Sequence, residues 1–152
     1  MRDLRLAALG ADRLAFGSTL ERETTYPESH WQEWATRGAT GGTEATFAAV
    51  DASGAWIGMT GVFSDHGVPH LWGMWVTPKW RRRGVATQLL RTALEWARVR
   101  TPAAAVELDV NPTQADAVRL YLAHGFEFTG AEQPLGHDPP AVARQMRKAG
   151  AE

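Results

Sequence analysis

The sequence predicts one α/β domain of the α+β type, in which a mixed, mostly antiparallel central sheet is flanked by helices. Three observations predict it. Residues 1–43 show helical apolar spacing, residues 45–76 read as a meander of β-rich segments, and the remainder alternates strand and helix. With 152 residues, of which 44% are hydrophobic and 22% charged, residues 1–152 are expected to form a single domain.

The N-terminal part is expected to be helical. Apolar spacing over residues 4–16 predicts one helix or two short ones, interrupted near Gly10 and Gly17. Ser18 is expected to cap a second short helix. Residues 27–34 predict a third helix, and the glycines of segment 38–42 are expected to break it.

The later elements follow from apolar runs bounded by turn residues. Asp51-Ala52-Ser53-Gly54 reads as a hairpin turn, and Gly125 as a helix stop. Strands are expected at residues 45–50, 56–63, 70–76, 104–110, 126–129 and 141–146, with helices at 84–100 and 113–124 and a loop at 134–140.

Composition excludes several functional classes. Sixteen Lys and Arg against seventeen Asp and Glu give a net charge of −1, which argues against nucleic-acid binding. The absence of cysteine excludes disulfides and thiolate chemistry, and the five histidines show no metal-ligand spacing. The N-terminus lacks a signal-peptide pattern and no apolar run spans a membrane, so we expect a cytoplasmic protein without membrane or metal partners.

The segment Arg81-Arg82-Arg83-Gly84-Val85-Ala86-Thr87 carries the strongest functional signal. It links a strand that ends near Pro78 to a strong helix. Free amides and the dipole at a helix N-terminus favour phosphate oxygens, and small residues let a diphosphate approach the backbone. A solvated basic loop before a surface helix is the alternative.

Two motifs in order resemble the GNAT N-acetyltransferase superfamily. Residues 81–86, Arg-x-x-Gly-x-Ala, are similar to its acetyl-CoA diphosphate signature. Residues 114–126, Gln-x-x-Ala-x-x-Leu-Tyr-x-x-x-Gly-Phe, are similar to its late helix, where Asn is usual at the first position. The resemblance covers residues 44–147 well and the first 43 loosely. The family usually begins with a strand, so either that edge strand is missing or the chain starts upstream of Met1.

The resemblance implies a cofactor site. Strands 70–76 and 106–110 would splay apart to admit the pantetheine arm of acetyl-CoA. Backbone groups of Trp75 and Val76 would bind that arm, together with either Gln114 or Asn111. The residues that would hold the diphosphate are Arg81, Arg82, Arg83, Gly84, Val85, Ala86 and Thr87.

The resemblance also implies direct transfer of an acetyl group to a primary amine in a ternary complex. Tyr121 would be the acid that protonates the leaving thiolate. Alternatively, Tyr121 is an ordinary aromatic residue of the core. The general base stays open, since a water chain or a neutral amine would also serve. The candidates are Glu21, Glu23, His70, Glu107 and Asp109.

The expected function is therefore that of an N-acetyltransferase acting on a small-molecule or protein amine. A catalytically weak acetyl-CoA sensor or interaction module is the alternative, and the family is often homodimeric. The seven tryptophans suggest one further expectation, because Trp31, Trp34 and Trp72 would line an acceptor cleft suited to an apolar or cationic group.

Overall fold

A six-stranded sheet in the order β1-β2-β3-β4-β6-β5 forms the centre of the computed structural model, which describes residues 1–136 and 141–151. The β3–β4 pair is parallel and the other neighbours are antiparallel, as the sequence predicts. The strands are β1 (Glu44–Val50), β2 (Trp56–Asp65), β3 (Val68–Val76), β4 (Val106–Val110), β5 (Glu127–Pro134) and β6 (Val142–Lys148).

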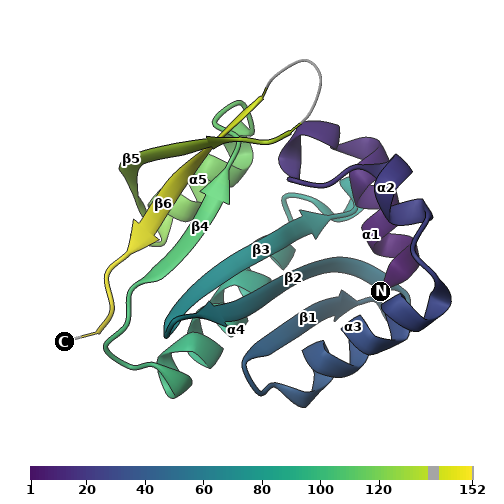
Figure 1. Cartoon of the computed structure of the whole chain (residues 1–152), viewed down its shortest axis with the longest axis horizontal. Coiled ribbons are helices and arrows are strands. Elements are labelled where there is room, and N and C mark those ends of the chain that lie inside the picture. Colours follow the sequence, from purple (N-terminus) through teal and green to yellow (C-terminus); the bar gives the residue numbers. More distant parts are fainter. Residues whose placement is uncertain (137–140, 152) are drawn as a thin grey trace.

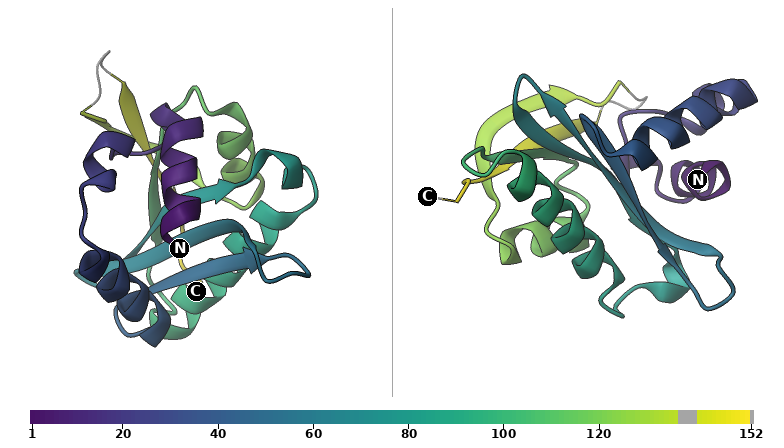
Figure 2. Two further views of the ribbon diagram at one scale, coloured as in Figure 1. Left: turned by 90° about the vertical axis from the view of Figure 1, so that its right-hand side faces the viewer. Right: turned by 90° about the horizontal axis from the view of Figure 1, so that it is seen from below.

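Helices cover both faces of this sheet (Figures 1 and 2). The N-terminal helices lie beside β1–β3 on one face, and α4 and α5 lie on the other. Residues 1–43 contain no strand, so the sheet begins at β1. The helices are α1 (Arg2–Ala11), α2 (Leu20–Thr24), α3 (Glu28–Thr40), α4 (Val85–Arg100) and α5 (Ala115–Ala123), with short 3₁₀ turns at Arg13–Ala15 and Pro78–Trp80.

The main core lies between the sheet and the α4–α5 layer. Leu89, Leu90, Ala93 and Ala97 recur at helical spacing along α4 and are buried. Leu90, Ala93 and Ala97 pack with inward residues of the strands, such as Leu108. Removal of this apolar surface from water holds α4, and therefore its N-terminus, against the sheet.

A second core lies under α1 on the opposite face. Leu4, Ala8 and Leu9 form the buried stripe of α1 and pack against Met59 of β2 and Trp75 of β3. This core fixes the end of α1 next to the end of β3, where the expected cofactor residues begin.

Of three expectations for the N-terminal part, two are confirmed and one is wrong. Helix α1 ends at Ala11, one residue after Gly10, and a separate 3₁₀ turn follows at Arg13–Ala15, so the expected interruption is present. Thr19, not Ser18, caps α2 by accepting a hydrogen bond from the Arg22 amide. Helix α3 ends at Thr40, before Gly41 with its φ of +65°, so the glycine segment breaks it as expected. Gly38 lies inside the helix, where a side chain would collide with Thr46 of β1, so glycine there permits close helix–sheet packing.

The other helices and strands begin and end within a few residues of their expected positions. Strand β4 starts at Val106, α5 starts at Ala115, and β5 and β6 extend beyond their expected ends. Residues 137–140 of the expected loop lie outside the described part of the chain. Gly125 adopts a φ of +85° directly after α5, as expected of a helix stop. Among the described residues, no helix has the length and apolar character needed to cross a membrane.

Candidate active site

Strands β3 and β4 separate after a short parallel contact. Their pairing is limited to His70 with Glu107 and Leu71 with Leu108, and Figure 1 shows the two strands diverging beyond it. Backbone groups on this edge of β3 after Leu71 therefore lack a β4 partner. The expected splayed pair is present.

A bulge in β3 sets the direction of that edge. Trp75 lies opposite Met59 of β2, whereas Trp72 lies opposite Gly61, so β3 carries one extra residue between the two tryptophans. Gly73 occupies the bulge with a φ of +65°, a conformation that costs glycine little. The bulge lets Trp72 and Trp75 contact the same α1-side cluster although they are three residues apart.

A cavity of about 610 Å³ occupies the splay and extends from the α4 N-terminus to α5. It brings together ten of the eleven expected site residues: Trp75, Val76, Arg81, Arg82, Gly84, Val85, Ala86, Thr87, Gln114 and Tyr121. Arg83 does not line the cavity; its guanidinium lies 5.2 Å from the centre of the Trp80 ring.

The N-terminus of α4 has the features of an anion site. Arg82 and Gly84 both have positive φ values, +59° and +80°, which turn the loop sharply into the helix. No side chain caps α4, and its first turn holds no acidic residue. The amides of Val85, Ala86 and Thr87 lack intrahelical acceptors because they begin the helix. These donors line the cavity, so they suit the diphosphate of a coenzyme A derivative.

Arg81 has a different environment from the other loop arginines. Its Nε donates to the Val76 carbonyl (2.8 Å), and its Nη2 donates to the Asp12 carboxylate (2.7 Å). Asp12 also accepts from the Trp75 indole (2.5 Å). Burial raises the pKa of Asp12, but the hydrogen bonds from Trp75 and Arg81 outweigh it and hold that pKa below its usual value.

Asn111 and Gln114 have different surroundings. Asn111 is 4% exposed; its amide donates to the Leu14 carbonyl (3.1 Å) and its Oδ1 accepts from the Thr113 amide (3.0 Å) and hydroxyl. Asn111 thus ties the start of α5 to the N-terminal segment. Gln114 lines the cavity.

Tyr121 lies on α5, belongs to the main core and lines the cavity. The side chain is 7% exposed and packs edge-to-face against Phe126. Burial raises the pKa of its hydroxyl, so Tyr121 keeps its proton at neutral pH.

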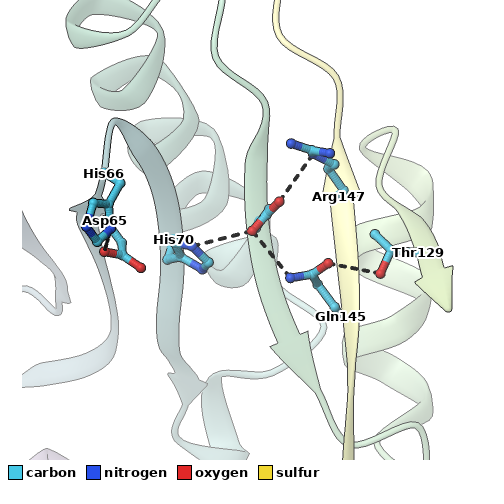
Figure 3. Close-up of polar contacts among 7 residues, drawn as sticks. Asp65, His66, His70, Thr129, Gln145 and Arg147 are labelled. Carbon is cyan, nitrogen blue, oxygen red and sulfur yellow. Dashed lines mark hydrogen bonds and ion pairs between the residues drawn. The ribbon is translucent and has the colours of Figure 1, made fainter. Parts of the chain in front are cut away.

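The acidic candidates have different surroundings. Glu107 on β4 is engaged by three side chains: His70 Nε2 at 3.4 Å, Arg147 Nε at 3.2 Å and Gln145 Nε2 at 3.3 Å. Figure 3 shows this network, in which Gln145 also accepts a hydrogen bond from Thr129.

Asp109 lies two residues further along β4, on the same face as Glu107, and lines the cavity. Desolvation raises the pKa of its carboxyl above the usual value; the charge of His70 opposes this shift and that of Glu107 adds to it. Among the acidic candidates, Glu21, Glu23 and Glu107 do not line this cavity.

Glu23 is held by a residue that sequence patterns did not identify. Both of its carboxylate oxygens accept from Arg5 (2.7 and 3.0 Å), and the two residues are only 2% and 7% exposed. Arg5 and Asp12 are both missing from the expected site because their partners are distant in sequence. Their own neighbours form an ordinary amphipathic helix, which gives no signal of either contact.

The expected aromatic cleft is formed in part. Trp34 packs against Trp72 with ring centroids 5.2 Å apart, and Trp72 lines the cavity. Trp31 stacks on Trp34 but is 3% exposed. The Arg5 guanidinium lies 5.7 and 5.9 Å from the ring centres of Trp34 and Trp72. The cleft therefore already contains a cation of the protein itself.

A splayed strand pair, a helix N-terminus with unpaired amides and a buried tyrosine that lines the same cavity together fit a protein that binds a long phosphorylated thioester. Comparison with known proteins agrees. The model of the acetyltransferase (GNAT) family matches residues 10–126. No curated protein matches the sequence.

Solved structures with the same fold are available for distant relatives. A GNAT family acetyltransferase from Streptococcus pneumoniae is 20% identical, with 98% of this chain and 90% of that chain covered and a TM-score of 0.81. The putative acetyltransferase YncA from Salmonella typhimurium, with acetyl-CoA, is 16% identical (99% and 87% covered, TM-score 0.80). A phosphinothricin acetyltransferase from Sinorhizobium meliloti, also with acetyl-CoA, is 16% identical (99% and 82% covered, TM-score 0.79).

The chain belongs to the acetyltransferase (GNAT) family, as its two motifs predict. It is accordingly an acetyl-CoA-dependent N-acetyltransferase.

Proposed function

We propose that this enzyme transfers the acetyl group of acetyl-CoA directly to a primary amine of a small molecule or protein, with both substrates bound at once. One observation carries the proposal: a single cavity joins the unsatisfied amides at the start of α4 to Tyr121 through the splay of β3 and β4. The cofactor would supply the activated thioester.

Different parts of the cavity bind different parts of acetyl-CoA. The amides of Val85, Ala86 and Thr87 hold the diphosphate, with charge added by Arg82. The unpaired edge of β3 after Leu71 hydrogen-bonds the pantetheine arm, and Gln114 contacts it from α5. Arg81 acts as a positioning residue, because its guanidinium is engaged by Asp12 and Val76.

Two side chains carry the proton transfers. The amine nitrogen forms a bond to the acetyl carbon while the bond from that carbon to sulfur breaks. Asp109 accepts the proton that the nitrogen loses, because its carboxylate lines the cavity and desolvation raises its pKa. Tyr121, which burial keeps protonated at neutral pH, donates its proton to the departing sulfur; Asp109 then releases its proton to solvent and the Tyr121 phenolate regains one from solvent.

The test is release of free thiol from acetyl-CoA over a panel of primary amines. We expect release that depends on the amine and yields an acetylated product by mass spectrometry. Tight acetyl-CoA binding with no release over any amine would instead support the sensor function. A cytoplasmic location, a homodimer, the single-domain assignment and the absence of metal remain predictions from sequence.

A further inference from the structure

A second hollow lies outside the cofactor cavity, between α2 and α3. It encloses about 300 Å³ on the side of the molecule where Figure 1 places the N-terminal helices. We call it the α2–α3 hollow. Its walls carry aromatic rings and charged groups: Arg22, Glu23, Tyr26, His30, Trp34 and Arg37.

Aromatic rings connect this hollow to the cofactor cavity. Tyr26 and His30 pack at 4.3 Å between ring centres, and His30 contacts Trp34 at 5.9 Å. Trp34 in turn packs on Trp72, which lines the cofactor cavity. One pair of indoles therefore separates the two spaces. An alkyl chain that crosses this pair would be buried against apolar ring surface.

The charges that line the α2–α3 hollow do not balance. Glu23 is its one acidic residue, and Arg5 binds both oxygens of that carboxylate from the buried side. The Nε of Arg37 pairs with the Glu44 carboxylate at 2.7 Å, and the two Nη groups of Arg37 take no part in this ion pair. Within the described part of the chain, Arg22 has no ion pair. The hollow therefore presents positive charge with no free carboxylate.

The wall of the hollow also carries a hydroxyl group without a partner. Ser18 lines the α2–α3 hollow, and its Oγ is buried without a hydrogen-bond partner among the described residues. Buried polar atoms are normally satisfied, because an unpaired one costs free energy. Because this oxygen has almost no exposed surface, an anion held by the Arg22 guanidinium would accept from Ser18 only after a rotation of the Ser18 side chain.

We propose that the α2–α3 hollow binds an anionic group at the far end of the amine acceptor. The acceptor is then an amino-acid-like molecule, with a primary amine at the splay, an apolar chain across Trp34 and Trp72, and a carboxylate or similar anion near Arg22 and Arg37. This inference rests on the proposed function. A polyamine would instead place a second ammonium group beside the guanidiniums of Arg22 and Arg37, and these like charges would repel. The Glu23 carboxylate could not compensate, because Arg5 already binds it.

The test is calorimetric binding of matched ligands to the acetyl-CoA-free enzyme. The ligands are ω-amino carboxylates (β-alanine, γ-aminobutyrate and ε-aminocaproate), alkylamines of the same lengths, and the diamines putrescine and cadaverine. We expect at least one amino carboxylate to bind about tenfold more tightly than its alkylamine, as a charge-assisted hydrogen bond implies. Arg22→Gln should remove most of that preference and leave alkylamine binding unchanged.

Arg98→Gln is the matched control, because it removes an exposed arginine of α4 that pairs with Glu95. It should bind every ligand as the wild type does. Equal or tighter binding of alkylamines or diamines would overturn the proposal, as would an Arg22→Gln variant that weakens all ligands alike. Thiol release distinguishes the failure of this inference from the failure of the proposed function. Transfer to amines with no preference for an anionic group would contradict only the anion site in the α2–α3 hollow. Arg22-dependent binding without any transfer would contradict only the proposed function.

Discussion

Arg81 donates a hydrogen bond to the Asp12 carboxylate at 2.7 Å, across 69 positions of the sequence. The pair joins the start of the diphosphate loop to the end of α1, and the Trp75 indole donates to the same carboxylate. One acidic side chain thus fixes the position of the loop relative to β3 and to the N-terminal helices.

Asp12→Asn should raise the KM for acetyl-CoA more than it lowers kcat, because the loop is displaced while Tyr121 stays in place. We expect a several-fold rise in KM and a lower melting temperature. Glu95→Gln is the control, since it removes one partner of an exposed ion pair within α4 and should change neither quantity. Equal KM values for Asp12→Asn and wild type would show that the pair does not position the loop.

The same pair has a pH signature. The pKa of Asp12 is lower in the folded protein than in the unfolded chain, so its contribution to stability is complete above the unfolded value and is lost as pH falls through the folded value. The stability difference between wild type and Asp12→Asn should therefore shrink below about pH 4. Thermal melts from pH 7 down to that range measure it, and a difference independent of pH would contradict the assignment.

Asp109→Asn should lower kcat by about 10²- to 10⁴-fold, the usual range for a lost proton acceptor. Because folding raises the pKa of Asp109, its carboxylate costs stability above that pKa, so the Asn variant should melt no lower than wild type. The acidic limb of the wild-type rate profile should disappear in Asp109→Asn and return in Asp109→Glu. An unchanged profile would mean that a water chain or a neutral amine carries this proton.

Tyr121→Phe should lower kcat while the KM for acetyl-CoA stays near the wild-type value, because the ring and its contact with Phe126 remain. Steady-state kinetics from pH 6 to 9 measure the effect. If turnover were unchanged at every pH, the hydroxyl would not be the proton donor and Tyr121 would be a packing residue.

Glu23→Gln should destabilise the protein by about 3–5 kcal/mol, because it leaves the buried Arg5 guanidinium without its counter-charge. Chemical denaturation measures the loss. A double variant, Arg5→Met with Glu23→Leu, removes both charges and should recover much of the stability. A Glu23→Gln variant as stable as wild type would show that the pair contributes little to the fold.

The loop from Arg81 to Thr87 and the tyrosine of α5 could be predicted because their chemistry depends on local sequence. A helix N-terminus and its small residues are encoded within a few positions, and Gly84 and Gly125 mark the ends of helices by their own conformational preference. Ten residues expected in the site therefore line one cavity.

The contacts that organise the site could not be predicted because they join distant segments. Nothing near Asp12 indicates that it meets Arg81 and Trp75, and the bulge at Gly73 appears only when β3 is aligned with β2. Arg83 has the same local context as Arg82, yet it stacks on Trp80. Close packing against Thr46 likewise overrides the helix-breaking tendency of Gly38.

The most direct test of the central claim is a calorimetric titration of acetyl-CoA into wild type, Gly84→Glu and Gly54→Glu. Both glycines have positive φ, +80° and +84°, with open space around them, so the two substitutions impose similar backbone strain. Gly54 lies in the hairpin turn between β1 and β2, whereas Gly84 opens the proposed diphosphate site. We predict that Gly54→Glu binds acetyl-CoA as wild type does and that Gly84→Glu loses binding. Equal binding by all three proteins would contradict the placement of the cofactor in the β3–β4 splay.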